Sequence, residues 1–291
     1  MKIAKNYADK AIDLAILLFF LFFSLTIIMP FWTMLVDSFS TEAFFLKKGI
    51  KLWPMEATLE PYRQVFANEI IGTAYFNTLF RTVVGASCTV AVCFAAAYAI
   101  SRQGLPLKRT ITALIVFTMF FGGGLIPTYL WYKQLGLINN RLALILPHLA
   151  VPYYILIMRN FLQVLPAELE ESALMDGASP YRIFLSIIIP VSTPVLATVC
   201  LWSAVFHWNE WFGAMIYTPK RSLMVLQLML RRILLENQAS AMLDMPDSFN
   251  KLPEETVKAA TMFITIGPII LVYPFVQKYF VKGIMTGSVK G

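Results

Sequence analysis

Charged residues are scarce in this sequence, and so are cysteines and histidines. Only 14% of its 291 residues are Asp, Glu, Lys or Arg, and 58% are hydrophobic, whereas a soluble domain has about 25% charged and about 45–50% apolar residues. Three cysteines cannot staple a chain of this length, which excludes a disulfide scaffold. The composition therefore predicts an integral membrane protein, and the net charge of +7 indicates basic cytoplasmic loops rather than nucleic-acid binding.

Acidic residues are absent from six apolar stretches that are each close to the length of about 20 residues needed to cross the bilayer core. A transmembrane β-barrel would show alternating strands of roughly ten residues instead. We therefore predict an all-α integral membrane protein in which residues 1–291 form a single transmembrane domain of six helices. The predicted spans are residues 14–36, 78–101, 110–132, 142–162, 183–207 and 259–281.

The distribution of lysine and arginine predicts the orientation. The segments on one side are short and rich in basic residues, starting with Lys2, Lys5 and Lys10. On the other side, basic residues are spread thinly over the long loops at residues 37–76 and 207–260. The positive-inside rule then puts both termini in the cytoplasm. Because the first apolar stretch is too long for a signal peptide and no small-residue cleavage site follows it, we interpret it as an uncleaved anchor.

The loop at residues 163–182, between the fourth and fifth spans, departs from the positive-inside trend. Its acids are Glu168, Glu170, Glu171 and Asp176. Pro166 suits the first position of a helix, Gly177 suits a left-handed C-cap, and Ser179, which precedes a proline, suits the N-cap of a second helix. The pattern predicts a short helix over residues 166–177, a tight turn, and a helix that enters the membrane. It is either a solvated loop or a docking element for a cytoplasmic partner.

The same loop resembles the cytoplasmic motif of permease subunits of bacterial ABC importers. That motif reads E-A-A, three residues, G, nine residues, I-x-L-P. Residues 171–173 (E-S-A), Gly177 and residues 187–190 (I-I-I-P) keep each spacing, and the departures are Ser172 and Ile189. The full spacing, in a cytoplasmic loop between late spans, makes the resemblance specific.

Further segments extend the resemblance over nearly the whole chain. Those similar to the sugar-importing, maltose-permease-like branch are T-L-E-P-Y at 58–62, W-N at 208–209, Q-K-Y-F-V-K-G at 277–283 and G-S-V-K-G at 287–291. Those similar to permeases for plant or algal polysaccharide fragments are F-G-G-G-L-I-P at 121–127, M-R-N-F at 158–161 and H-W-N at 207–209.

The resemblance implies a division of labour between subunits. The short helix would be the coupling helix between helices 4 and 5, seated in a cleft of a separate ATPase. The residues expected to couple the chain to the ATPase are Glu168, Glu171, Ser172, Ala173, Met175, Asp176 and Gly177. A second permease, expected to be a different chain, two ATPase subunits holding ATP and Mg, and an extracytoplasmic solute-binding protein would complete the importer. This chain itself would bind no cofactor, metal or nucleic acid and would have no catalytic residue.

An oligosaccharide path is predicted more loosely, because sugars are recognised by aromatic faces beside polar groups. The candidates are His148, Tyr153, Tyr154, Trp202, His207, Trp208, Asn209 and Trp211. Many of them would also suit an aromatic belt at the membrane interface. Asn77 and Arg81, at the start of the second span, either face an acidic substrate or reach back to the interface. The sequence leaves open which sugar is carried and whether it contains uronic acids.

Glycines and prolines mark possible irregular points within two spans. Residues 122–124 are three glycines in the third span, and Pro190 and Pro194 lie in the fifth. These residues either let the helices bend or only adjust their packing. Outside the spans, residues 223–235 form an amphipathic run that either lies in the interface or dips into the membrane.

The alternatives are an ion-coupled secondary transporter and a channel. A secondary transporter usually needs ionisable residues inside the membrane, and the six predicted spans contain no Asp or Glu. A channel does not need an acidic docking helix. The sequence has no P-loop, so ATP would have to be bound by another chain.

Overall fold

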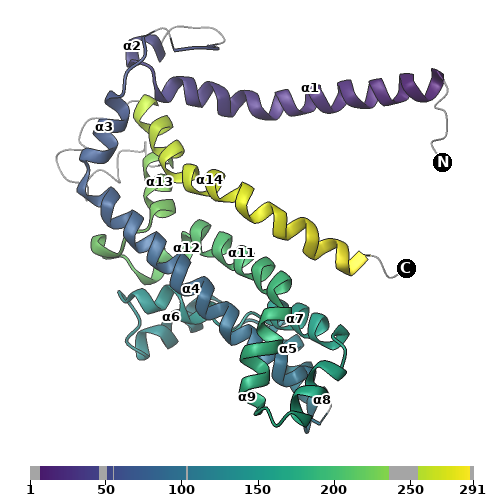
Figure 1. The fold of residues 1–291 in the computed structure, drawn as a ribbon. Helices are drawn as coiled ribbons and strands as arrows, with labels where there is room; N and C mark the ends of the chain where they lie inside the picture. Colours follow the sequence, from purple (N-terminus) through teal and green to yellow (C-terminus); the bar gives the residue numbers. More distant parts are fainter. Residues whose placement is uncertain (1–6, 46–50, 55, 103, 236–254, 289–291) are drawn as a thin grey trace. The chain divides into compact units, whose positions relative to one another are not determined.

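The structure, a computed structural model, describes residues 7–45, 51–54, 56–102, 104–235 and 255–288 (Figure 1). Side chains are described for these residues up to Leu271, except that of Leu235. Over these residues every regular element is helical, and the β-pairing is limited to an isolated bridge between Ser40 and Ala57. This confirms the predicted all-α class. The chain divides into two units, residues 1–68 with 232–266 and residues 69–231 with 267–291.

The first unit contains the long N-terminal helix. Its helices are α1 (Tyr7–Ser38), α2 (Glu42–Phe45), α3 (Glu60–Ala67) and the first part of α14 (Glu255–Ser288). The indole Nε1 of Trp32 in α1 donates a hydrogen bond to the Leu52 carbonyl at 2.9 Å, and the hydroxyls of Ser38 and Tyr62 lie 2.9 Å apart. The most apolar window of α1 has no buried residue. Its sides are therefore free to contact lipid or another chain.

The second unit is built around α4. Its elements are α4 (Glu69–Ser101), α5 (Lys108–Phe120), α6 (Leu125–Gln134), η1 (Arg141–Leu144), η2 (Leu146–His148), α7 (Pro152–Val164), α8 (Glu168–Met175), α9 (Pro180–Ile183), η3 (Phe184–Ile188), α10 (Ile189–Val191), α11 (Thr193–Asn209), α12 (Phe212–Tyr217), η4 (Arg221–Leu223) and most of α13 (Leu226–Leu235). Both α7 and α11 pack along α4. Small side chains such as Ala97 and Cys93 allow this close approach, and Phe94, Met158 and Val199 fill the core beside them.

Three of the predicted spans are broken helices. The third consists of α5 and α6, which meet at 112° around the glycines at 122–124. The fourth joins η1 and η2 to α7 at 45°, and the fifth bends by 77° at Ser192, between the predicted breakers Pro190 and Pro194. Glycine favours non-helical backbone, and proline lacks the N–H that continues the hydrogen-bond ladder. The breaks in the third and fifth spans therefore fall at or beside residues that stabilise a helix least.

The number of spans stays a prediction. Within the described residues, α1 and α4 are continuous helices long and apolar enough to cross a membrane, and the three bent pairs qualify if each is one span. The sixth predicted span, residues 259–281, falls within α14, whose side chains beyond Leu271 lie outside the described residues. The amphipathic run at 223–235 contains α13, in which Leu226 and Leu228 are buried.

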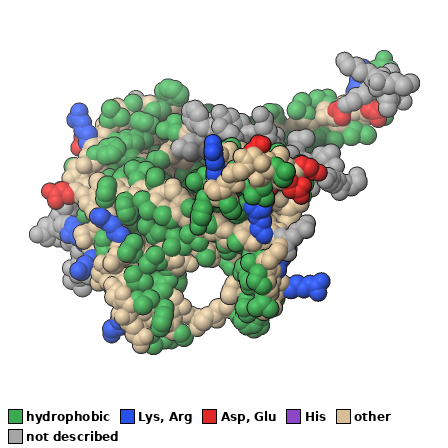
Figure 2. All heavy atoms as spheres, turned by 60° about the horizontal axis from the view of Figure 1, so that its bottom comes forward, with side chains coloured by type: hydrophobic (Ala, Val, Ile, Leu, Met, Phe, Trp, Pro, Cys, Tyr) green, Lys and Arg blue, Asp and Glu red, His purple; other side chains and the backbone are tan. Residues whose placement is uncertain are grey.

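Hydrophobic side chains cover much of the face shown in Figure 2, and the lysine and arginine side chains on it are isolated from one another. Large apolar residues are exposed on many helices, including Phe22 on α1, Val83 on α4 and Leu114 on α5. Exposed apolar surface of this extent is expected of helices that contact lipid or other membrane subunits.

Candidate functional site

The helix α8 lies inside the predicted docking loop and ends as the sequence predicts. The backbone N–H of Gly177 donates to the Leu174 carbonyl and that of Ala178 donates to the Ala173 carbonyl, each at 3.0 Å. Gly177 has φ +76°, the left-handed conformation that glycine adopts without strain. This pair of bonds is a Schellman cap, which satisfies the last carbonyls of the helix.

The start of α8 is two residues later than the predicted Pro166. Leu165 is extended, as residues before proline usually are. The Pro166 carbonyl accepts a hydrogen bond of 3.4 Å from the Leu169 N–H, and the Ala167 carbonyl accepts shorter ones from the N–H groups of Glu170 and Glu171. Ala167 is therefore the N-cap, and Pro166 precedes the helix.

A second helical segment follows the cap at once. The Ser179 hydroxyl accepts a hydrogen bond from the Arg182 N–H at 3.4 Å, which confirms Ser179 as its N-cap. The segment continues through α9, a π-turn (η3) and α10 to the bend at Ser192. The chain that leaves α8 is thus helical, as the sequence predicted, and it is interrupted by the π-turn and by the bend near the two prolines named as possible irregular points.

Most of the residues predicted to couple the chain to an ATPase are exposed, although Glu171 also lines a cavity together with Glu170 and Arg102. Glu168, Glu171, Ser172, Met175 and Asp176 are exposed, and Met175 is 88% exposed. Gly177 is exposed as well, but its role is to end the helix. Ala173 differs from the others because it is buried in the core cluster, so it anchors α8 instead of offering a contact.

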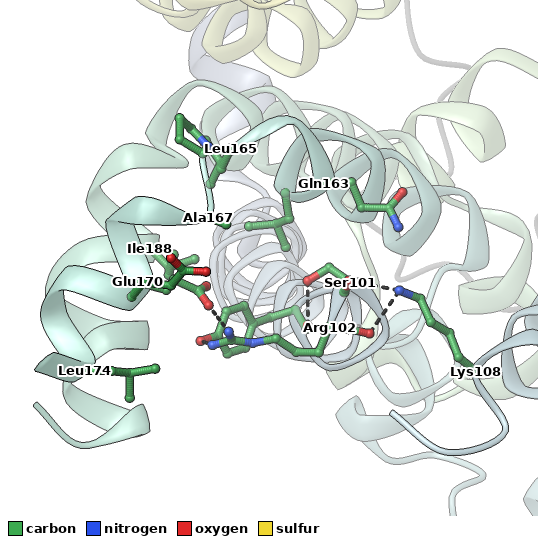
Figure 3. A pocket seen from close by; sticks show the side chains of 13 residues that line it. Ser101, Arg102, Lys108, Gln163, Leu165, Ala167, Glu170, Leu174 and Ile188 are labelled. Atoms are coloured by element: carbon green, nitrogen blue, oxygen red, sulfur yellow. Dashed lines mark hydrogen bonds and ion pairs between the residues drawn. The ribbon is translucent and has the colours of Figure 1, made fainter. Parts of the chain in front are cut away.

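Glu170 lies on the opposite side of α8 and forms an ion pair with Arg102, just beyond the end of α4 (Figure 3). The Arg102 guanidinium lies 4.3 Å from the centre of the Tyr98 ring and donates to the Tyr98 hydroxyl. The Lys108 amine donates to the Ser101 and Arg102 carbonyls at 3.0 and 2.9 Å. A cavity of about 580 Å³ borders these residues, so water reaches the ion pair.

The predicted substrate-path residues fall into four separate environments. One is an aromatic group in which the ring of Trp202 lies 6.0 Å from that of Tyr153 and 6.1 Å from that of Tyr154. Tyr153 is 51% exposed and Trp202 is partly exposed. These rings offer flat apolar faces of the kind that sugars stack against.

His207 belongs to a second, closed environment. It is 1% exposed, its ring lies 6.1 Å from that of His148, and neither ring nitrogen has a hydrogen-bond partner among the described residues. The ring packs against Gly85, where an added Cβ would lie 2.6 Å from its Nε2. His207 therefore does not line an open path in this conformation, and neither does Trp208, which is 5% exposed.

Asn209 and Trp211 occupy the remaining two environments. The Asn209 amide donates to the Val205 carbonyl at 2.8 Å and accepts from Gln227 at 3.4 Å. The Trp211 ring lies under the Arg231 guanidinium at 3.6 Å from the ring centre. Both side chains thus contact neighbouring segments, and only Tyr153, Tyr154 and Trp202 form a shared aromatic surface.

Arg81 is the cation of the second predicted span, and its partner is Glu210, just after α11. The guanidinium is 2% exposed, lies 3.1 Å from the Glu210 carboxylate, and donates to the His207 and Glu210 carbonyls. It therefore satisfies the last carbonyls of α11 and neither reaches solvent nor faces an open path. Asn77 is similarly occupied, because its amide donates to the Ser222 and Met224 carbonyls at 3.0 and 2.9 Å.

Neither the Arg81–Glu210 pair nor the Arg102–Glu170 pair was predicted from the sequence. Arg81 and Glu210 stand 129 residues apart, and Glu170 was grouped with the acids expected in the first turn of the docking helix. The available signal was the isolation of each charge at a span boundary, where an unpaired charge is expensive. Among the described residues, no group of three or more His, Cys, Asp or Glu is placed to hold a metal ion.

Comparison with known proteins places these features in context. Residues 104–286 match the family described as the binding-protein-dependent transport system inner membrane component. The chain is 37% identical over 285 residues to the polygalacturonan/rhamnogalacturonan transport system permease protein YtcP of Bacillus subtilis (strain 168), which covers 97% of this chain and 99% of that protein. It is also 37% identical over 284 residues to Protein LplC of the same organism, covering 98% and 96% of the two chains.

A solved structure is similar over almost the same length. It is a crystal structure of a bacterial ABC transporter involved in the import of the acidic polysaccharide alginate. One of its chains aligns with this one at a TM-score of 0.89 and 29% identity, covering 96% of this chain and 100% of that chain.

Proposed function

The chain belongs to the family of binding-protein-dependent transport system inner membrane components, the permease subunits of ABC importers, and we propose that it imports an acidic oligosaccharide. In this proposal it forms part of the translocation path and couples it to ATP hydrolysis by separate subunits. The observation that carries the coupling role is α8, a capped helix on which Glu168, Glu171 and Met175 are exposed while Ala173 is buried in the core.

The exposed side of α8 suits docking into a cleft of an ATPase subunit. Burial of Ala173 in the core and the ion pair between Glu170 and Arg102 hold α8 against the rest of the unit, so the position of Glu171 is fixed. A carboxylate in such a place forms a charge-assisted hydrogen bond with a basic group of the partner. In this proposal ATP and Mg are bound by two ATPase subunits, and a second permease, a different chain, completes the membrane part.

The proposed orientation places both termini and α8 in the cytoplasm. The positive-inside distribution supports it, as does the exposure of the acids of α8. The opposite ends of the spans would then face an extracytoplasmic solute-binding protein that delivers the sugar. We propose that residues 207–260 help to receive that protein, although the part at 236–254 lies outside the described residues.

The acidic nature of the sugar is proposed from two relatives, whose names refer to polygalacturonan and to alginate. Within this chain we propose that Tyr153, Tyr154 and Trp202 supply stacking faces for sugar rings. Arg81 is not proposed as the cation that meets the uronate, because Glu210 already neutralises it.

The test is ATP hydrolysis by the assembled transporter. The chain is co-expressed with its permease partner and ATPase, reconstituted in nanodiscs, and given its binding protein with trigalacturonate, an alginate trisaccharide or neutral raffinose. We expect the ATPase to copurify and an acidic sugar to stimulate hydrolysis several-fold more than raffinose. Failure of the ATPase to copurify would contradict the importer subunit, and stimulation by raffinose alone would contradict the acidic substrate.

A further inference from the structure

We propose that α4 transmits the movement of α8 across the membrane to the end of α11, and that the ion pair between Arg102 and Glu170 couples α8 to α4. This inference rests on the proposed function, since it assigns a route to the signal between the ATPase and the binding protein. It makes Arg102 and Glu170 positioning residues, because they act through α8 and touch neither nucleotide nor sugar.

The ion pair at the C-terminal end of α4 is held from several sides. Glu170 of α8 pairs with Arg102, and Arg102 in turn is stacked on Tyr98 one turn earlier. Lys108 donates to the carbonyls of Ser101 and Arg102, which fixes the backbone that carries the guanidinium. A displacement of α8 is therefore transmitted to the backbone of α4 through a charge-assisted hydrogen bond, whose role is to fix the two groups relative to each other, since a partly exposed pair adds little to stability.

The segment that follows α8 in sequence also reaches this end of α4. The Phe184 ring lies 4.8 Å from that of Tyr98 and 5.6 Å from that of Phe94. Tyr98 therefore contacts both Arg102 and the helix that leaves the docking loop. The two flanks of α8 converge on one turn of α4, so α8 cannot move far without moving this turn.

The alternative route is covalent, from α8 through α9, η3 and α10 into α11. That route contains a π-turn at Phe184–Ile188 and the 77° bend at Ser192. The regular hydrogen-bond ladder is interrupted at both points, so this route is not one continuous helix. In contrast, α4 is an unbroken helix of 33 residues from Glu69 to Ser101. Rigid helices and contiguous packed contacts are the kind of network through which two distant sites are coupled, and α11 packs along α4.

The other contact is the Arg81–Glu210 pair. From Arg81 to Arg102 the helical rise is about 32 Å at about 1.5 Å per residue, close to the bilayer core thickness of about 30 Å. Arg81 donates hydrogen bonds to the carbonyl of His207, near the end of α11, and to that of Glu210, just after it, and it forms an ion pair with the Glu210 carboxylate. A displacement of α4 is therefore passed to the end of α11, which the proposed orientation places next to the binding protein.

The experiment measures whether the outside signal still reaches the ATPase. Arg102→Glu, Glu170→Arg and the combined charge swap are reconstituted with the partner subunits and the binding protein loaded with trigalacturonate. Each single reversal should leave basal ATPase activity in place and abolish the stimulation, with uptake per ATP falling at least severalfold. The swap should restore most of the stimulation, because it rebuilds the ion pair in reverse. Arg109→Glu, an exposed arginine of α5, is the matched control and should behave as wild type.

Two results would overturn the proposal. One is normal stimulation in both single reversals. The other is a swap variant that assembles normally but is still not stimulated. If the single variants fail to assemble, the swap alone decides, because recovery of both assembly and stimulation supports the coupling role of the ion pair. Stimulation of the wild-type transporter is read first, so a failure of the proposed function shows there and not in the variants.

Discussion

Two ion pairs of the same kind lie along α4 in different surroundings, one at Arg81 within the helix and one at Arg102 just beyond its C-terminal end. The side chains of Arg81 and Glu210 are 2% and 18% exposed, and those of Arg102 and Glu170 are 39% and 21% exposed. The first pair also binds backbone carbonyls at the end of α11, whereas the second borders a cavity of about 580 Å³.

This difference separates stability from coupling. A charge buried without its partner is costly, so breaking the Arg81–Glu210 pair is a folding problem. An exposed ion pair contributes little to stability, so the Arg102–Glu170 pair is better explained by the movement it transmits. The comparison therefore predicts that variants of the Arg81–Glu210 pair lose stability, whereas variants of the Arg102–Glu170 pair lose function.

The largest effect is expected from Glu210→Ala. This change leaves the Arg81 guanidinium buried without a carboxylate, which costs about 3–5 kcal/mol. The melting temperature of the purified transporter should fall sharply, together with the amount of protein in the membrane. The control is Glu69→Ala, which removes an exposed acid in the first turn of α4, the helix that carries Arg81. A Glu210→Ala transporter that melts with the control would refute the stabilising role of the pair.

Gly85→Ala tests how tightly α4 packs against α11 one turn from Arg81. The new methyl group would meet three atoms of the His207 ring at 2.6–2.9 Å, and overpacking of this kind costs about 1–3 kcal/mol. Gly72→Ala is a matched control in the same helix, because no atom lies within 4 Å of its added Cβ. Thermal denaturation should separate the two, with the Gly72 variant as stable as wild type or more so. Equal melting temperatures would mean that the His207 ring moves aside freely.

Gly177→Val moves the test to the docking helix. Gly177 has φ +76° and open space around it, so the cost is backbone strain of about 1–2 kcal/mol rather than a clash. We expect the protein to reach the membrane but uptake to be lost, because the cap that orients α8 is disturbed. Gly177→Asn, a residue that tolerates the left-handed conformation, should keep most of the uptake. Similar uptake by both variants would argue against the cap as the functional feature.

The smallest stability effect is expected from Arg102→Gln. Removing an exposed ion pair should change the free energy of unfolding by no more than about 1 kcal/mol. Differential scanning calorimetry of the assembled transporter measures this, with Arg109→Gln on the exposed surface of α5 as the reference. A loss of stability as large as that of Glu210→Ala would contradict the distinction between the Arg81–Glu210 and Arg102–Glu170 pairs.

Local features of α8 could be predicted from the sequence, because they depend on neighbouring residues. Gly177 ends the helix and Ser179 begins the next segment, as the cap rules require. The glycines at 122–124 and the prolines near Ser192 indicated where spans could bend, although the angles depend on packing that the sequence does not show. The start of α8 was wrong by two residues, since Pro166 suits both the first helical position and the position before the cap.

The partners of charged residues could not be predicted, because they are remote in sequence. Nothing near Arg81 indicates Glu210, and Glu170 resembles its exposed neighbours until the fold turns it toward Arg102. The aromatic candidates were similarly divided by the fold, which buries His207 and Trp208 but leaves Tyr153 exposed. Periodicity identifies which segments are apolar, whereas the contacts between broken helices decide which side chains meet.

The most direct test of the central claim is the distance between α8 and α4 during the transport cycle. Probes are placed by non-natural amino acids at Leu169 on α8 and Ala99 on α4, both exposed, and their distance distribution is measured without nucleotide and with ATP plus vanadate. The account predicts the same distribution in both states for the wild type and a changed or broadened one for Arg102→Glu. A shift of the wild-type distance on nucleotide trapping would show that α8 moves independently of α4 and would contradict the account.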